Sequence, residues 1–417
     1  TAIDLVAFGS SHRSPPRLIR RSSEAPLPAT KSRRALPKAP LAAPLAEPAA
    51  GDRRAVLARL ITYVPFDAVL AAVDGATLGP GRRAIGGTVL FADLSGFTAL
   101  SEAYAARGRD GTDELTRLLN RIFSVLLEDA VFPFEGFLVK FAGDSLLVYF
   151  EGPGHLARAC AAALATQEAM AELPKTEPRL RHLAIRVGVA SGPFDLMTVG
   201  APSGRLDCFL AGDAAQRAVL AADYVGPRDI LVDAPGKPRG PFRAGSNLLE
   251  LVCAGQVPKR QPIAYVLGGL SEERVEHAIG QLERFIAPAL WERIVGSLSS
   301  ETVPAERRHA CAVFAEIDEW GIALERLSEH YALACQCAGR HGGLLNKIDG
   351  TRRGPRILAT FGIPSTRGDD ERRAVAFALE LRGRLRTPVR IGLESGPLFA
   401  GEVGSVLKRE VTVMGDT

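Results

Sequence analysis

The chain has 417 residues, which at about 150 residues per domain predicts two or three domains and excludes a single small module. Its residues are 47% hydrophobic and 24% charged, as in soluble globular proteins, and no run reaches the roughly 18–20 apolar residues that span a bilayer. The 51 basic and 47 acidic residues leave a net charge of +4, too small and dispersed to indicate a nucleic-acid partner.

The cysteines and the two ends of the chain bear on its compartment and its completeness. The six cysteines show no C-x-x-C spacing, which disfavours a disulfide framework or a structural zinc site and favours a reducing, cytoplasmic location. The chain begins at Thr1 without a methionine and stops at Thr417 in what reads as an unfinished domain, so we expect a fragment. Residues 1–50 are rich in Pro, Ala and Arg, which predicts a disordered tail.

After the tail, the hydrophobic pattern alternates between helix and strand. Residues 51–84 predict a leader helix and a Gly/Pro/Arg linker. Apolar residues at three- and four-residue spacings between 115 and 126 predict a helix with one buried face. Two apolar runs joined through Gly143-Asp144 predict a β-hairpin with an acid in its turn. The predicted elements are strand 88–94, helix 115–126, strands 137–141 and 146–150, helix 155–172 and strand 183–189.

The same sequence pattern occurs twice. The string VGVASGP at 187–193 returns as IGLESGP at 391–397, and Pro65 of the leader matches Pro288. Mixed strands and helices without strict βαβ repetition predict an α+β fold for each copy. We interpret an amphipathic stretch within 256–300 as a second leader helix that packs on its own domain. The predicted divisions are a tail at 1–50, a leader and linker at 51–84, a first domain at 85–255, a second linker and leader at 256–303, and an incomplete second domain at 304–417.

Two acids of the first copy stand where chemistry is expected. Asp93 ends an apolar strand and Asp144 lies in the hairpin turn, which predicts that both sit at one edge of a sheet. Two carboxylates at a phosphate site suit hard cations such as Mg²⁺. The turn at 95–98 then opens a helix, whose N–H groups can receive phosphate oxygens. A simpler interpretation stays open, in which Asp93 and Ser95 are helix N-caps and Asp144 is an ordinary turn acid.

The strings FADLSGFT at 91–98 and KFAGD at 140–144 resemble the two metal-site motifs of class III nucleotidyl cyclases. The tandem arrangement is most similar to the soluble, bicarbonate-responsive adenylyl cyclases, over about residues 55–417. This resemblance implies two ferredoxin-like α+β domains that pair as a pseudo-dimer and share an active site. It also implies two Mg²⁺ or Mn²⁺ ions on Asp93, Asp144 and the Leu94 carbonyl, and a triphosphate held by Ser95, Gly96, Phe97 and Thr98.

The second copy lacks the metal acids but keeps a base-recognition pattern. Glu316 stands in the place of Asp93, and Thr351 in that of Asp144. By the same resemblance, Lys347 donates to adenine N1 and the Thr412 hydroxyl accepts from the adenine amino group. Guanine presents the opposite pattern, which favours ATP over GTP. Taken singly, Lys347 is equally well a surface charge and Thr412 an ordinary strand residue.

The resemblance leaves the transition-state residues and regulation open. Gln216 stands where the family has a catalytic Asn, and the Asn and Arg of the second copy would lie beyond Thr417. Lys140 matches the lysine of the family's bicarbonate site, and Arg217 is the nearest substitute for its arginine. A regulatory anion site at Lys140 and Arg217 is therefore a further expectation.

These motifs together predict an adenylate cyclase, which converts ATP to 3′,5′-cyclic AMP and pyrophosphate by two-metal phosphoryl transfer between its two domains. The alternative is a catalytically inactive module that senses a nucleotide or an anion. We expect no nucleic-acid partner and no transmembrane segment. The sequence contains no P-loop, no nucleophile elbow and no H-E-x-x-H motif that would favour other chemistry.

Overall fold

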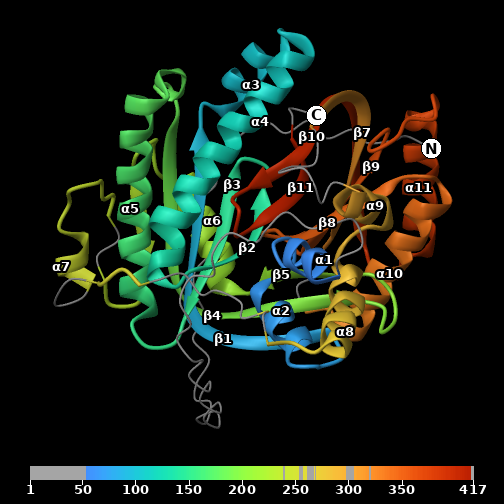
Figure 1. Ribbon diagram of the computed structural model, residues 1–417, viewed down its shortest axis with the longest axis horizontal. Coiled ribbons are helices and arrows are strands. Elements are labelled where there is room, and N and C mark those ends of the chain that lie inside the picture. Colours follow the sequence, from blue (N-terminus) through green and yellow to red (C-terminus); the bar gives the residue numbers. More distant parts are fainter. Residues whose placement is uncertain are drawn as a thin grey trace. The chain divides into compact units, whose positions relative to one another are not determined.

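The computed structural model describes residues 53–414, apart from 238–239, 253–256, 261–266, 268, 297–304 and 319–320 (Figure 1). The chain divides into two units, and all described residues belong to the unit Ala42–Thr417. The predicted tail at 1–50 lies outside the described residues. Among the residues that are described, no helix is both long enough and apolar enough to cross a bilayer.

Each copy builds a mostly antiparallel sheet, and the two sheets share one strand order. The first sheet contains β1 (Gly81–Ser95), β2 (Phe137–Ala142), β3 (Ser145–Glu151), β4 (Ala184–Gly200), β5 (Leu206–Ala211) and β6 (Ile230–Asp233). The second contains β7 (Glu306–Ile317), β8 (Leu344–Gly350), β9 (Pro355–Phe361), β10 (Val389–Gly404) and β11 (Arg409–Met414). The orders are β2-β3-β1-β4-β5, with β6 parallel to β4, and β8-β9-β7-β10-β11. The matching orders confirm the prediction of two α+β domains in tandem.

Helices cover both faces of the first sheet, because side chains along a strand alternate between its faces. The described helices of the first copy are α3 (Phe97–Ala105), α4 (Gly108–Ser124), the π-helix η1 (Val125–Val131), η2 (Phe132–Phe134), α5 (His155–Thr176), η3 (Pro178–Leu180), α6 (Asp213–Asp223) and α7 (Leu248–Val252). Leu90 and Ala92 of β1 join the core formed with α4 and α5, whereas Val89 packs with α6 on the other face. An added Cβ on Gly188 would lie 2.0 Å from the Ala218 carbonyl oxygen, so the α6 backbone lies directly on β4.

The second sheet packs against α10 (Leu324–Arg340) and α11 (Asp370–Arg384), and the two copies exchange parts of their cores. Val199 and Phe209 of the first sheet belong to the core that contains Tyr331 of α10. In return, Phe399 and Val403 of β10 belong to the core of the first copy. This reciprocal packing buries apolar area from both copies, and it places the edge of one sheet beside the edge of the other.

The leader helices contact each other, which corrects one sequence interpretation. They are α1 (Arg53–Leu60), α2 (Phe66–Val73), α8 (Glu272–Leu282), the short η4 (Glu283–Phe285) and α9 (Pro288–Gly296). Leu57 and Leu60 of α1 pack with Ile279 and Leu282 of α8. The expectation that the second leader packs on its own domain is therefore wrong for α8, although α9 does contact Leu344 of the second copy. An amphipathic pattern identifies a buried face but not the element that covers it.

A buried charge cluster fastens the first leader to the second sheet. The Glu402 carboxylate on β10, 1% exposed, accepts from Arg59 at 3.0 Å and from Arg409 at 2.6 Å. It also accepts from the Tyr63 hydroxyl. Lys408 donates from Nζ to the Val64 carbonyl oxygen at 2.6 Å, and burial lowers the pKa of this lysine to about 7. The segment that follows α1 is thereby tied to β10 and to the start of β11, the strand that carries Thr412.

Candidate active site

Asp93 lies at the end of β1, where the strands on both sides hold its carboxylate. Ser145 of β3 and Arg186 of β4 are its register partners. The Ser145 hydroxyl donates to Oδ1 at 2.5 Å, and the Arg186 Nε donates to Oδ2 at 2.7 Å. Arg186 also approaches Asp223 at the end of α6, with 3.5 Å between Nη2 and Oδ1. The carboxylate of Asp93 is therefore fixed at the sheet edge by a serine and an arginine.

Asp144 occupies the β2–β3 turn, close enough to Asp93 for the negative charge of Asp93 to affect its pKa. Gly143 before it has a φ of +69°, which glycine adopts without strain. Burial, and then the negative charge of Asp93, raises the pKa of Asp144 from 3.8 to about 6, although Arg186 acts in the opposite direction. A divalent cation would relieve this repulsion, and carboxylate oxygens are the ligands that Mg²⁺ prefers.

The two acids fit such an ion only as part of its ligand set. In the described stretches of the chain, no group of three or more His, Cys, Asp or Glu side chains is placed to hold a metal. Mg²⁺ commonly binds through one or two carboxylates, with waters and substrate phosphates as its remaining ligands. The pair therefore suits an ion that arrives together with a phosphorylated substrate.

Residues 95–98 make the turn from β1 into α3. Gly96, with a φ of +90°, is the N-cap residue, and no side chain caps the first turn. The interpretation of Asp93 and Ser95 as N-caps is therefore wrong. An added Cβ on Gly96 would lie 3.0 Å from the carbonyl oxygen of His182, so the turn packs closely against the segment before β4. The uncapped N–H groups stand at the edge that carries the two acids, an arrangement that suits a phosphate.

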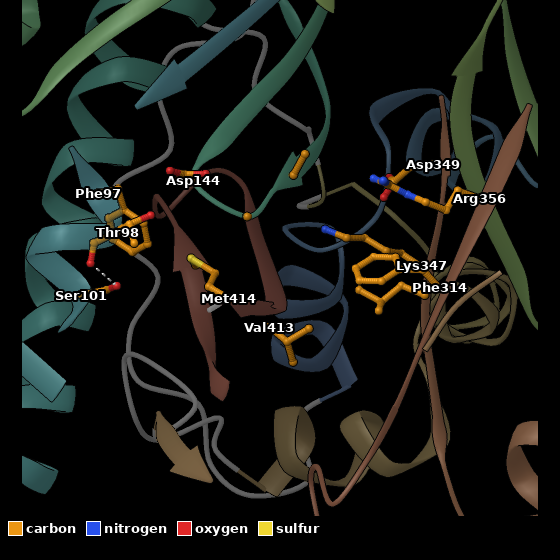
Figure 2. Close-up of a pocket in the computed structure, with 13 residues that line it drawn as sticks. Phe97, Thr98, Ser101, Asp144, Phe314, Lys347, Asp349, Arg356, Val413 and Met414 are labelled. Atoms are coloured by element: carbon orange, nitrogen blue, oxygen red, sulfur yellow. Dashed lines mark hydrogen bonds between the residues drawn. The ribbon is translucent and has the colours of Figure 1, made fainter. Parts of the chain in front are cut away.

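A cavity of about 240 Å³ lies between the first copy and the second. Figure 2 shows Phe97, Thr98 and Asp144 on one side of it, and Lys347, Asp349 and Arg356 on the other. The Arg356 guanidinium stands 5.1 Å from the centroid of the Phe314 ring, which also lines the cavity. Asp93 and Thr412 are not among its lining residues. The charge of Asp93 acts on Asp144, which lines the cavity, and the Thr412 hydroxyl lies 3.5 Å from Nζ of Lys347, which also lines it. Both copies contribute to this single site.

Lys347 of β8 is buried and charged beside Thr412. Its Nζ donates to the Phe141 carbonyl oxygen at 2.7 Å and to Glu410 at 3.3 Å, and lies 3.5 Å from the Thr412 hydroxyl. Burial opposes the charge, but Glu410 and Asp349 outweigh it and raise the pKa of Lys347. The structure thus brings together Lys347 and Thr412, the two residues expected to read the base. Of the three contacts that the Lys347 ammonium makes, the one with Thr412 is the longest.

Lys140 of β2 makes the mirror-image contacts. Its Nζ donates to the Ile348 carbonyl oxygen at 2.6 Å and pairs with Asp207 at 2.8 Å. The N–H of Ile348 donates to Asp207 at 2.9 Å, just as the N–H of Phe141 donates to Glu410 at 3.0 Å. Each lysine therefore donates to a carbonyl oxygen of the other copy: Lys140 to that of Ile348, which follows Lys347, and Lys347 to that of Phe141, which follows Lys140. These two hydrogen bonds connect the two sheets.

The structure does not bring Lys140 and Arg217 together as an anion site. Arg217 of α6 pairs with Asp213 at 2.6 Å and donates to the Ser191 carbonyl oxygen at 2.7 Å. Within the described residues the two cations share no partner, and Arg217 does not line the small cavity beside Lys140. Lys140 is instead neutralised by Asp207. A response to bicarbonate stays a prediction of the resemblance.

The second copy has an acid and a threonine in place of the acid pair. Glu316 of β7 accepts from the Thr351 hydroxyl at 2.6 Å, in the turn between β8 and β9. Arg356 and Arg390 are the register partners of Glu316, as Ser145 and Arg186 are those of Asp93. The second sheet therefore places one carboxylate where the first places two.

Arg186 is a site residue that the sequence did not reveal. Its contact with Asp93 depends on the register of β1 with β4, which the hydrophobic pattern leaves undetermined. One signal was available, because the repeat extends by one residue, with Arg186 before one string and Arg390 before the other. The acids Asp207 and Glu410 also occupy matching places in the two copies, but their cross-copy contacts require knowledge of the paired sheets.

Known proteins are similar to this chain in sequence and in fold. Residues 85–221 match the family model for the adenylate and guanylate cyclase catalytic domain. Adenylate cyclase type 10 of Mus musculus is 22% identical over 391 residues, which cover 81% of this chain and 23% of the relative. The Homo sapiens protein of the same name is 23% identical over 381 residues, which cover 79% of this chain and 23% of the relative. The chain thus spans about a quarter of the length of these curated relatives.

A solved structure extends the likeness of fold to both copies. A class III adenylyl cyclase-like ATP-binding protein from Pseudomonas aeruginosa has a TM-score of 0.51 at 14% identity, and the match covers 89% of each chain. At this identity the likeness concerns the fold. Residues 85–221 therefore belong to the class III nucleotidyl cyclase catalytic-domain family, and the chain has the class III cyclase fold.

Proposed function

We propose that this chain forms an adenylate cyclase, which converts ATP to 3′,5′-cyclic AMP and pyrophosphate in the cavity between its two copies. The observation that supports this most strongly is the asymmetry of that cavity. An acid with a raised pKa lies on one wall, and a buried, charged lysine lies on the other. The curated relatives named adenylate cyclase type 10 support the choice of reaction.

In this proposal the second copy reads the base. A lysine ammonium has donors only, so Lys347 suits adenine N1, which accepts, and not guanine N1, which carries a proton. Its two shorter contacts, to Phe141 and Glu410, hold the ammonium in place. The third N–H of the ammonium makes only the 3.5 Å contact with Thr412, so adenine N1 can accept from it in place of Thr412. The Thr412 hydroxyl then accepts from the adenine amino group.

The first copy is proposed to hold the phosphates. Asp93, Asp144 and the Leu94 carbonyl would bind two Mg²⁺ or Mn²⁺ ions, which lower the pKa of the ribose 3′-hydroxyl and offset charge on the phosphates. The uncapped N–H groups of the turn at 95–98 would donate hydrogen bonds to the triphosphate oxygens. The 3′-oxygen then bonds to the α-phosphorus, its proton leaves, and the bond to the departing pyrophosphate breaks. Positioning by the two walls supplies much of the rate.

The test is turnover of the full-length protein with ATP and, separately, with GTP. We expect cyclic AMP and pyrophosphate in equal amounts, and a lower kcat/KM for GTP. Equal kcat/KM values for the two nucleotides would contradict the role of Lys347, and an absence of cyclic product would contradict catalysis.

The described cysteines form no disulfide, which supports a reducing, cytoplasmic location.

A second candidate is a nucleotide-binding module without catalysis. The solved structure with the same fold is described as a cyclase-like ATP-binding protein, and Asp93 here is already paired with Arg186. In that case ATP would bind without turnover. Equilibrium binding of ATP, measured beside the turnover assay, separates the two candidates.

A further inference from the structure

A second cavity, of about 420 Å³, lies on the first copy between α5, the start of β4 and the loop after β6. Three arginines line it: Arg181, Arg228 and Arg243. Its apolar wall comes from Met170 of α5 and from Leu183 and Ile185, which lead into and begin β4. None of its described lining residues is acidic. The cavity is separate from the active-site cavity, since the two share no lining residue.

The arginines are not neutralised from within the cavity. Arg181 donates from Nε to the His182 ring at 2.9 Å, and neither Arg181 nor Arg228 forms an ion pair within the described parts of the chain. Arg243 pairs with Asp229 at 2.6 Å, and its side chain is 71% exposed. Among the described residues, the three guanidinium groups thus have one ion-pair partner, Asp229, which leaves an excess of positive charge at the cavity.

The wall of the cavity is held in place by hydrogen bonds to β4. The N–H of Arg228 donates to the Ile185 carbonyl oxygen at 2.9 Å, and Gln167 of α5 donates to the same oxygen at 2.8 Å. Arg228 has a φ of +70°, a left-handed conformation that is unfavourable for a residue with a side chain. The chain therefore keeps this arginine at the cavity against a local preference for other conformations.

The same wall reaches the active site. Arg181 and residues 183–185 line the cavity, and the next residue, Arg186, pairs with Asp93. The His182 carbonyl oxygen lies against the turn glycine Gly96, close enough that a Cβ there would be 3.0 Å away. A ligand that orders residues 181–185 therefore bears directly on the turn at 95–98 and on Arg186.

We propose that this cavity binds a small organic anion, with a phosphate or carboxylate group on Arg181 and Arg228 and an apolar part against Met170, Leu183 and Ile185, and that its occupancy stabilises the turn at 95–98. Guanidinium groups match phosphate and carboxylate geometry, and the volume lies within the usual range for small-molecule sites. The ligand acts from outside the active-site cavity.

The probe for the test is 8-anilinonaphthalene-1-sulfonate, an aromatic anion that fluoresces in apolar sites. We expect saturable binding to the full-length protein, displacement by inorganic phosphate, and a Kd at least tenfold higher in Arg181→Ala/Arg228→Ala. The matched control is Arg326→Ala/Arg382→Ala, which removes two exposed arginines of the second copy and is expected to bind like wild type. Equal binding by the two double variants, or no displacement by phosphate, would overturn the site.

The coupling to the turn has its own readout. Hydrogen exchange of the backbone amides at 95–99, measured without nucleotide or metal, is expected to slow when the probe binds wild type but not the Arg181→Ala/Arg228→Ala variant. Unchanged exchange in wild type at a saturating probe concentration would overturn the coupling. Neither measurement depends on turnover, so both remain decisive if the protein proves not to be a cyclase.

Discussion

Replacing Asp144 by Asn tests whether this acid serves a metal or simply suits a turn. The pKa of Asp144 is about 6 in the folded chain, against an ordinary 3.8, because burial and Asp93 disfavour its charge. A folded-state pKa above the unfolded value means that the wild-type protein loses stability as the pH rises from about 4 to about 6. The difference corresponds to at most about 3 kcal/mol, and partial exposure reduces it to about 1–2 kcal/mol.

Without metal, Asp144→Asn should therefore raise the free energy of unfolding by about 1–2 kcal/mol at about pH 8 and leave it unchanged at about pH 4. Adding Mn²⁺ should stabilise the wild type and not the variant, because the metal binds the folded carboxylate pair. Urea unfolding measures both effects, and Glu168→Gln on the exposed face of α5 is the control. A variant that is destabilised at both pH values, with no difference in the Mn²⁺ effect, would refute the metal-site interpretation and favour an ordinary turn acid.

Three further predictions follow from the asymmetry of the two copies and from the leader cluster. Glu316→Ala should keep ATP turnover within about threefold of wild type, because the second copy lacks the acid pair; a loss equal to that of Asp144→Asn would contradict a single site. Lys347→Glu should lower kcat/KM for ATP by about 100-fold, because the base loses its donor; an unchanged value in steady-state kinetics would rule out base reading. Glu402→Gln should lower the free energy of urea unfolding by about 3 kcal/mol, since Arg59 and Arg409 stay buried beside a neutral group; a loss below about 0.5 kcal/mol would contradict the leader attachment.

The tandem architecture could be predicted from the sequence, because the internal repeat is visible in the amino-acid sequence itself. The matching strings at 187–193 and 391–397 fall on β4 and β10, which hold the same place in their sheets. The hairpin through Gly143-Asp144 follows from local turn chemistry and is confirmed by the pairing of β2 with β3. Local patterns of this kind need no knowledge of tertiary contacts.

The contacts of Arg186 and those between the two copies could not be predicted from the sequence, because they depend on strand register and on how the two sheets pair. Register decides that Arg186 meets Asp93, and a shift of one residue would place it on the other face. Likewise, the exchange of Lys140 and Lys347 across the interface needs both sheets in place. The helical pattern of α8 showed a buried stripe but could not show that α1 covers it. The chemistry expected of Lys347 and Thr412 therefore stays a prediction, although the two side chains do meet.

The central claim is that one catalytic site forms between the two copies. The most direct measurement compares the full-length wild type with Asp144→Asn, with ATP and Mg²⁺ or Mn²⁺, and follows cyclic AMP, pyrophosphate and bound ATP together. We predict cyclic AMP and pyrophosphate in equal amounts from the wild type, and ATP binding without product from the variant. Bound ATP without cyclic AMP from the wild type, under either metal, would contradict the claim and make the chain a nucleotide sensor.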